Sequence, residues 1–225
     1  MDNAAAVPRK RKKPKTKAGK SRAETWRLKK LLQLEQSFWA QGIEHVAGVD
    51  EVGRGPLAGP VLAAAVIMPC GVTIRGVQDS KQLTAEKRER LFVEIREKAL
   101  CIGIGGASSR EIDRINILRA SHVAMQRAIR RLSVRPQHIV VDGLRVELLG
   151  PEHTAVIDGD AKVHCVACAS IVAKVVRDRL MRRLAPRYPM YGWDHNVGYA
   201  TADHRLAINL GGLSPHHRRS FIEQQ

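Results

Sequence analysis

Four acidic residues of this 225-residue chain lie at the expected ends of strands, where side chains from distant parts of a sequence can meet. Asp50 and Glu51 close one apolar run, and Asp142 closes another. Asp160 follows a third run, at the start of a helix-like stretch. Converging carboxylates repel each other unless a cation neutralises them, and Mg²⁺ and Mn²⁺ prefer oxygen ligands. Two such ions, about 3.5–4 Å apart, can activate a water and stabilise the leaving oxygen of a phosphodiester.

Spacing alone does not select these four carboxylates. Asp79, Asp158 and Asp178 satisfy the same argument. An acidic residue after a strand also caps a helix or forms a turn more often than it binds a metal. The pattern therefore indicates an acidic metal site and leaves its membership open.

The net charge of the chain is +16, which favours a polyanionic partner, because Lys and Arg neutralise phosphates and release counterions. Residues 1–25 contain nine Lys or Arg and two acidic residues, and the remainder of the chain is also basic. Charge alone fits a non-catalytic nucleic-acid-binding protein equally well. It also fits a protein that binds membrane surfaces.

The elements that must position the carboxylates are visible as apolar runs that alternate with stretches of helical spacing. Strands are expected at residues 45–50, 60–68, 101–107, 138–141 and 154–157. Helices are expected at residues 84–100, 109–132 with a kink and a cap at Ser109, 165–184 and 203–210. This alternation, without an internal repeat, predicts one α/β domain with a mixed sheet.

The N-terminal segment changes character after residue 22. Residues 1–22 are rich in Lys and Arg and poor in hydrophobic side chains, so a disordered basic tail is expected there. Such a tail can bind nucleic acid or only keep the protein soluble. Residues 23–40 predict an amphipathic helix that packs on the body through Trp26, Leu28 and Phe38, among others. The folded domain is therefore expected to span residues 23–225.

The cysteines and the apolar runs favour a cytoplasmic protein. Cys165 and Cys168 form a CxxC pair, but no second pair lies near enough to predict a zinc site, so buried thiols are expected. No apolar run reaches the roughly 18 residues that a membrane span needs, and nothing resembles a signal peptide. A cytosolic protein with reduced thiols and no membrane partner is expected.

Seven segments, in order, resemble the ribonuclease HII family, the type 2 ribonucleases H. The longest is AGVDEVGRGPLAGPV at residues 47–61. The others are DSKQL (79–83), IVVDG (139–143), DGDAK (158–162), ASIVAKVVRD (169–178), GYAT (198–201) and HHRRSF (216–221). The resemblance implies a ribonuclease H-like fold, in which helices flank a central mixed β-sheet. It also implies metal-dependent cleavage of the RNA strand of RNA–DNA hybrids, and incision 5′ to single ribonucleotides in duplex DNA that leaves 3′-hydroxyl and 5′-phosphate ends.

The same resemblance selects the site residues. It makes Asp50, Glu51, Asp142 and Asp160 the catalytic, metal-binding carboxylates, with Mn²⁺ or Mg²⁺ as cofactor. It further implies substrate contacts through Gly53, Arg54, Gly55, Lys81 and Tyr199. The two glycines suit a loop whose backbone approaches a sugar closely enough to recognise a 2′-hydroxyl. The counterpart of Tyr199 in the family stacks on the deoxyribose beside the ribonucleotide, and that of Lys81 contacts phosphate.

Two residues beside Asp160 depart from the family pattern. Asp158 stands where a lysine is common, and Val163 stands where a serine is common. Asp158 is expected to add negative charge near the metal site, and Val163 to remove a hydroxyl that could contact phosphate. Retuned substrate binding is expected rather than loss of activity. Asp178 is expected to order its helix through neighbouring arginines.

Three alternatives are weaker. A non-catalytic basic nucleic-acid-binding protein has no need of four carboxylates at strand ends. A metal nuclease of the same fold that acts on branched DNA would not need the GRG and GYAT segments. Ribonuclease HIII has a folded N-terminal substrate-binding domain, for which the forty or so residues before this core are too few and too basic. A monomer is expected.

Overall fold

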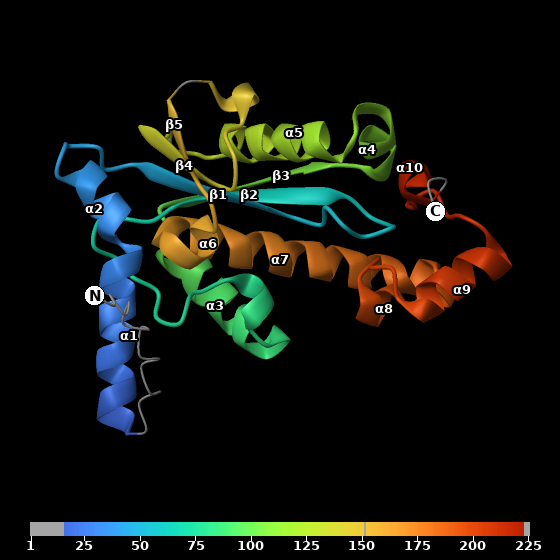
Figure 1. Cartoon of the computed structure of the whole chain (residues 1–225), viewed down its shortest axis with the longest axis horizontal. Helices are drawn as coiled ribbons and strands as arrows, with labels where there is room; N and C mark the ends of the chain where they lie inside the picture. The colour runs from blue at the N-terminus through green and yellow to red at the C-terminus, as the bar shows by residue number, and fades with distance from the viewer. Residues whose placement is uncertain (1–15, 151, 223–225) are drawn as a thin grey trace, which may run out of the picture.

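A five-stranded mixed sheet forms the centre of the computed structural model, which describes residues 16–150 and 152–222 (Figure 1). Its order is β3-β2-β1-β4-β5. The strands are β1 (Val46–Val52), β2 (Val61–Ile67), β3 (Cys101–Ala107), β4 (His138–Asp142) and β5 (His153–Val156). Strand β2 is antiparallel to both of its neighbours, β1 and β3, whereas β1, β4 and β5 run parallel. The predicted mixed sheet is thus confirmed.

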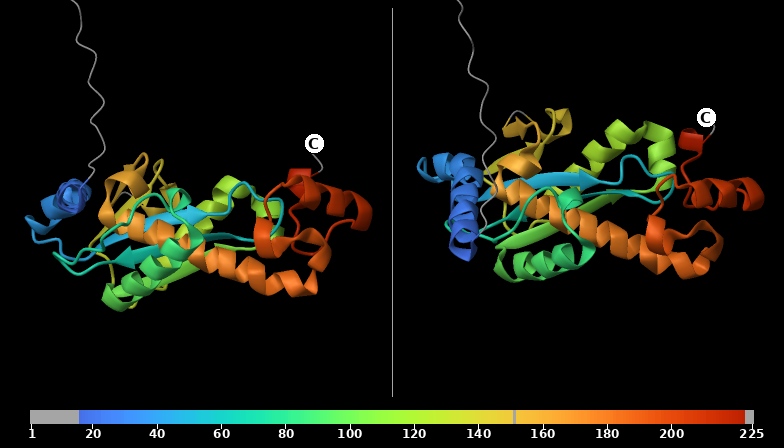
Figure 2. Two further views of the ribbon diagram at one scale, coloured as in Figure 1. Left: turned by 90° about the horizontal axis from the view of Figure 1, so that it is seen from below. Right: turned by 60° about the horizontal axis from the view of Figure 1, so that its bottom comes forward.

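Helices cover both faces of this sheet, because its strands are apolar on both sides. Helices α4 (Ser109–Ile115) and α5 (Ile117–Arg130) lie on one face, and α3 (Ala85–Lys98) and α7 (His164–Leu184) on the other (Figures 1 and 2). Separate apolar clusters fill the two interfaces. The remaining helices are α1 (Lys17–Leu31), α2 (Gln33–Trp39), α6 (Gly159–Lys162), α8 (Trp193–Asn196), α9 (Ala202–Gly211) and α10 (Arg219–Ile222).

Gly48 allows β1 and α7 to pack with their backbones almost in contact. A Cβ atom at this position would lie 2.2 Å from the carbonyl carbon of Cys165 and 2.4 Å from the nitrogen of Val166. No side chain larger than hydrogen fits in that space. The strand that carries Asp50 is therefore held directly against the helix that follows Asp160.

The N-terminal boundary was predicted wrongly. Residues 17–22, expected to belong to a disordered tail, lie in α1, whose first turn is capped by the Thr16 hydroxyl as it accepts from the Gly19 N–H. The rest of the expected tail lies outside the described residues, except Thr16. The amphipathic helix predicted for residues 23–40 is two helices, which meet at Leu32. Trp26 was expected to face the body and is instead 59% exposed.

The kinked helix predicted from residue 109 is also two helices. Asn116 adopts a φ of 65°, which ends α4, and its side chain caps α5 by accepting from the Arg119 N–H. The cap of α4 is Ser108 rather than Ser109, in a capping box with Glu111.

The structure also bears on the cysteines and on the apolar character of the helices. Cys165 and Cys168 are buried and free, as predicted. Over the described ranges, none of the helices combines the length and apolar character that crossing a membrane requires.

Candidate active site

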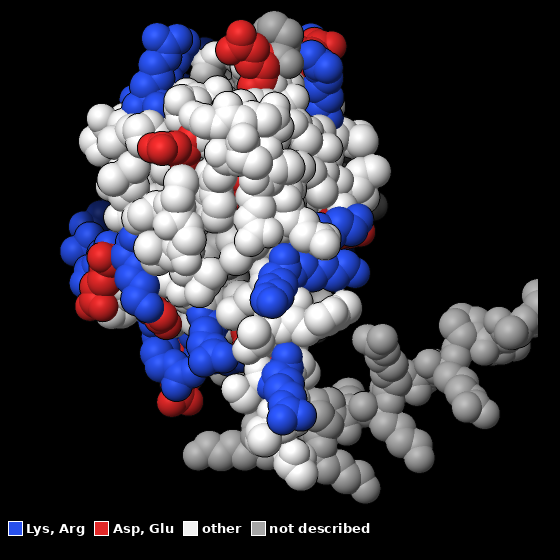
Figure 3. All heavy atoms as spheres, turned by 90° about the vertical axis from the view of Figure 1, so that its left-hand side faces the viewer, with Lys and Arg blue, Asp and Glu red and all other residues white. Residues whose placement is uncertain are grey.

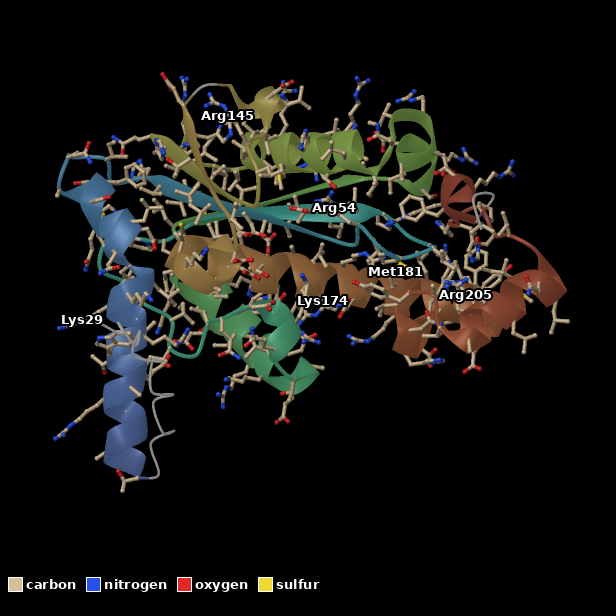
Figure 4. The ribbon with its side chains drawn as sticks, in the orientation of Figure 1. Lys29, Arg54, Arg145, Lys174, Met181 and Arg205 are labelled. Carbon is tan, nitrogen blue, oxygen red and sulfur yellow. The ribbon has the colours of Figure 1, made fainter. Side chains whose placement is uncertain are left out.

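A single pocket of about 360 Å³ contains all nine residues that the sequence predicts for the site. Its lining includes the four carboxylates and the five expected substrate-contacting residues: Asp50, Glu51, Asp142, Asp160, Gly53, Arg54, Gly55, Lys81 and Tyr199. Arg54, on the loop after β1, and Lys174, on α7, both line this pocket and lie one above the other in Figure 4. Side chains from β1, β4 and the turn before α7 therefore meet in one place.

The sheet register explains why the carboxylates converge. Strands β1 and β4 are parallel neighbours with Val49 opposite Val141, so Asp50 and Asp142, the next residue on each strand, lie at the same level. The turn after β5 brings in Asp160, because the N–H of Gly159 donates to a carboxylate oxygen of Asp142 over 2.6 Å.

Burial and repulsion from neighbouring carboxylates raise the pKa values of Asp50, Glu51 and Asp160. Asp50 is only 6% exposed, and its pKa is raised first by burial and then by the charges of Glu51 and Asp142. Burial also raises the pKa of Glu51, while the neighbouring Arg54 guanidinium, 3.3 Å away, lowers it. The pKa of Asp160 is raised to about 6, first by burial and then by Asp142.

The four carboxylates of the pocket offer the type of ligand that a hard divalent cation prefers. All the ligands it can offer are carboxylate oxygens, and a bound cation would relieve the repulsion that raises the pKa of Asp50. Across residues 16–150 and 152–222, no three acidic, His or Cys side chains already stand close enough to hold a metal ion. The residues therefore fit the metal chemically, and the carboxylates would have to draw closer to enclose it.

The three acidic residues outside the predicted four have different environments. Asp79 lies near enough to Asp160 to raise its pKa, through charge and through a side-chain hydrogen bond. Asp158 has a side chain that is 72% exposed, lies 3.6 Å from Lys162 and is not among the groups that shift the pKa of Asp160. The extra negative charge expected from Asp158 is therefore directed to solvent.

One expectation about α7 is corrected, and the residue between α6 and α7 is buried. Asp178 was expected to pair with arginines, but its carboxylate lies 2.9 Å from the ammonium of Lys174, one helical turn earlier. Val163, which replaces the common serine, is buried in a small apolar cluster with Val46 and Val166. Its side chain contributes to packing.

Sequence reasoning missed Ser170 and Lys174, which also line the pocket. The hydroxyl groups of Ser170 and Ser80 are hydrogen-bonded to each other over 3.0 Å, and a hydrogen bond from Ser170 lowers the pKa of Asp50. The ammonium of Lys174 lies 5.5 Å from the centre of the Tyr199 ring. Residues 170, 174 and 178 are spaced by four on one helix, and this spacing within a matched segment is the signal that could have revealed them.

The GRG loop, residues 53–55, has one glycine that its geometry requires. Gly53 has a φ of +91°, and a Cβ there would lie 2.2 Å from Nε of Arg177. Gly55 has open space around the same position. The first glycine therefore serves the fold, and the second leaves room for a ligand.

Basic side chains are abundant on the end of the molecule that carries α1 and α2. Figure 3 shows Lys and Arg around the edge of this end, interspersed with Asp and Glu, and largely uncharged side chains at its centre. The distribution is suited to contact with phosphates over a broad surface rather than at one point.

Known proteins are similar to this chain in both sequence and fold. The family model described as ribonuclease HII matches residues 47–224. A ribonuclease HII of Thermosynechococcus vestitus is 54% identical over 191 residues, which cover 84% of this chain and 89% of the relative. The crystal structure of ribonuclease H2 from Pyrococcus horikoshii OT3 has a TM-score of 0.64 at 30% identity, covering 78% and 92% of the two chains. The structure of Bst-RNase HIII in complex with Mn²⁺ shares the fold at 19% identity, with a TM-score of 0.58 over 81% and 69% of the two chains.

Proposed function

The chain belongs to the ribonuclease HII family, and from this we propose that its pocket is the active site of a metal-dependent endoribonuclease. Members of this family act on RNA–DNA hybrids, and incision at single ribonucleotides within duplex DNA fits the family. The observation that carries the proposal is the convergence of Asp50, Glu51, Asp142 and Asp160 in one pocket with the GRG loop and Tyr199.

The four carboxylates are the proposed ligands of the divalent cation. Bound there, the cation would activate a water for attack on the scissile phosphate and stabilise the departing 3′-oxygen. Mn²⁺ and Mg²⁺ both suit the all-oxygen donor set. Mn²⁺ has the additional support that the neighbouring HIII structure is described as a complex with this ion.

The chain's own residues bind and orient the duplex. Gly55 leaves the backbone of the GRG loop open to a sugar, so that main-chain groups can recognise the 2′-hydroxyl. Tyr199 is 39% exposed on the pocket wall, where its ring can pack on the neighbouring deoxyribose. Lys81 is exposed and lines the pocket, where it supplies a cation for a phosphate.

The cytoplasm is the proposed location of the protein, and a monomer its proposed state. Free, buried thiols at Cys165 and Cys168 suit the reducing cytoplasm, where ribonucleotides left in DNA have to be removed. A monomer is proposed, because the described pocket obtains all nine predicted residues from one chain.

The test uses labelled duplex DNA containing one ribonucleotide, and a uniform RNA–DNA hybrid, each with Mg²⁺, Mn²⁺ or EDTA. The expected result is a cut on the 5′ side of the ribonucleotide that leaves a 3′-hydroxyl and depends on the metal. Absence of a metal-dependent cut in both substrates would refute the proposal. It would also favour the non-catalytic nucleic-acid-binding protein, for which binding without cleavage is the expected outcome.

A further inference from the structure

Two adjacent buried residues, His217 and Arg218, approach the GRG loop and Tyr199 from behind. They belong to the HHRRSF segment, which does not line the pocket and has no part in the function described so far. Arg218 bonds the main chain of the GRG loop directly, and His217 reaches the main chain of Tyr199 through the ring of His204.

Arg218 holds the carbonyl groups of the GRG loop. Its guanidinium is fully buried and donates to the carbonyls of Gly53 over 2.6 Å, Arg54 over 2.9 Å and Gly59 over 3.0 Å. Since these carbonyls point inward to Arg218, the loop's remaining main-chain groups are free to face the pocket. Buried charged hydrogen bonds of this kind are among the stronger ones in proteins.

Arg177 connects the same loop region to the segment that carries Tyr199. It is also fully buried, and it donates to the carbonyls of Pro60 and Val197 over 3.0 Å each, and of Ala58 over 3.1 Å. The carbonyl of Gly198, next to Tyr199, accepts in addition from the N–H of Leu57. The two substrate-contacting elements are therefore held as one unit.

His217 reaches Tyr199 through a second histidine. The N–H of Ser214 donates to Nδ1 of His217 over 2.9 Å, so the ring proton of His217 lies on Nε2. That proton faces Nε2 of His204 at 3.0 Å, which also accepts from the Trp193 indole N–H. The proton of His204 must therefore lie on Nδ1, from which it donates to the carbonyl of Tyr199 over 2.8 Å.

This chain of bonds requires both imidazoles to be neutral. Burial lowers the pKa of His204, and burial together with His204 lowers the pKa of His217 to about 4. Both rings are thus neutral at physiological pH, and each has one fixed tautomer.

We propose that His204, His217 and Arg218 are positioning residues that fix the spacing between the GRG loop and Tyr199, and so determine selectivity for the junction between a ribonucleotide and DNA. The proposal rests on the proposed function, in which the loop contacts the ribose and Tyr199 contacts the following deoxyribose. A uniform hybrid presents ribose to the loop but no deoxyribose to Tyr199 on the cleaved strand. Loss of the spacing is therefore expected to impair junction substrates more than uniform hybrids.

The test is the ratio of kcat/KM for a duplex with one ribonucleotide to kcat/KM for a uniform hybrid. His204→Leu removes the donor to the Tyr199 carbonyl, and the ratio is expected to fall about 10-fold, as for the loss of one buried hydrogen bond. His204→Asn places its amide nitrogen near the position of Nδ1 and is expected to keep the ratio within about 3-fold of the native value. His204→Gln reaches the position of Nε2 instead, and serves as the loss variant if the leucine variant does not fold.

Two controls separate positioning from general destabilisation. His138→Leu removes an imidazole that hydrogen-bonds Thr154 on the neighbouring strand and packs on Phe38, outside the pocket lining, and should leave the ratio unchanged. In a Tyr199→Ala background, His204→Leu should change the ratio no further, because the two residues act through one contact.

Equal loss of kcat/KM on both substrates, with the ratio unchanged, would overturn the proposal. The full 10-fold change persisting in the Tyr199→Ala background would overturn it as well. Failure of the proposed function itself is distinguishable, because the native enzyme would then lack metal-dependent cleavage of either substrate.

Discussion

The carboxylate of Asp142 accepts a hydrogen bond from the main-chain N–H of Gly159, 2.6 Å away, and so ties the end of β4 to the turn that carries Asp160. One oxygen of Asp142 is used in this bond, and the other is left for a ligand. The position of Asp160 relative to the sheet therefore depends on a second acidic residue of the same site.

Asp50→Asn should abolish activity and stabilise the metal-free protein. Burial and the charges of Glu51 and Asp142 raise the pKa of the Asp50 carboxyl group, which means that its ionised form is unfavourable in the folded protein. The neutral amide of Asn removes this unfavourable contribution to the free energy of folding. We expect turnover to fall by about 10²-fold or more, and the melting temperature in EDTA to rise. Thermal unfolding with and without Mn²⁺ checks both effects: Mn²⁺ should stabilise the native protein more than the variant. Undiminished turnover would remove Asp50 from the site.

Gly48→Ala should unfold or strongly destabilise the protein. Its Cβ would lie 2.2 Å from the Cys165 carbonyl carbon, and neither β1 nor α7 can retreat without disturbing the core. A loss of about 3 kcal/mol or more in the free energy of unfolding is expected, measured by urea denaturation. A variant with native stability would contradict the packing described for β1 and α7.

Gly55→Ala should separate folding from substrate binding. Nothing lies within 4 Å of the added methyl group, so the melting temperature is expected to match that of the native protein. The methyl group would however occupy the space proposed for a sugar, and KM for both substrates should rise about 10-fold. Unchanged KM would mean that the sugar does not approach Gly55.

Lys81→Gln should reduce the salt dependence of substrate binding. Each phosphate contact contributes about 0.9 to the slope of log K against log salt concentration. The slope measured for the metal-free protein on a duplex is therefore expected to decrease by about 1 in the variant. Lys98→Gln is a matched control, because Lys98 lies on α3, paired with Glu94 and outside the pocket. An unchanged slope for Lys81→Gln would exclude a phosphate contact there.

Acid should weaken the junction between α4 and α5. The hydrogen bond from Arg127, and those from Ser108, lower the pKa of Glu111 from 4.5 to about 2. A depressed carboxyl pKa stabilises the fold fully above pH 4.5, and this contribution is lost as the pH falls from 4.5 towards 2. The side chain of Glu111 is 25% exposed, so screening limits the effect to about 1–2 kcal/mol.

Glu111→Gln tests this pH dependence. The variant should be less stable than the native protein at pH 7, with the difference shrinking as the pH approaches 2. Denaturation curves at several pH values measure it. A stability difference that stays constant over this range would contradict the role of the charge.

The sequence located the strands that carry the carboxylates, because buried strands appear as apolar runs. Asp142 ends β4 as expected, whereas β1 continues past Asp50 and Glu51 to Val52 in its pairing with β2. The sequence also predicted the alternation of strands and helices. It did not predict the start of α1, where a Thr16 cap and helix-forming Lys and Ala residues act without any apolar signal. The break at Asn116 was visible only as a kink, since one residue with positive φ separates two helices of the same face.

Long-range contacts to the main chain were beyond the reach of the sequence. Arg218 donates to main-chain carbonyl groups, and every residue has such a group. No pattern of side chains in the sequence can therefore predict its partners. The partner of Asp178 was misjudged because Lys174 and Arg182 both lie four residues from it on α7, so helical spacing alone does not decide between them.

The bonds from Arg218 to Gly53 and Arg54 join residues 165 and 164 positions apart. During synthesis the ribosome adds the GRG loop more than one hundred residues before Arg218, which donates to its carbonyl groups. A nascent chain halted before His217 would already contain all four carboxylates, but the carbonyls of Gly53 and Arg54 would lack the donor that Arg218 supplies. The GRG loop therefore acquires its Arg218 hydrogen bonds only after all five strands of the sheet have been synthesised.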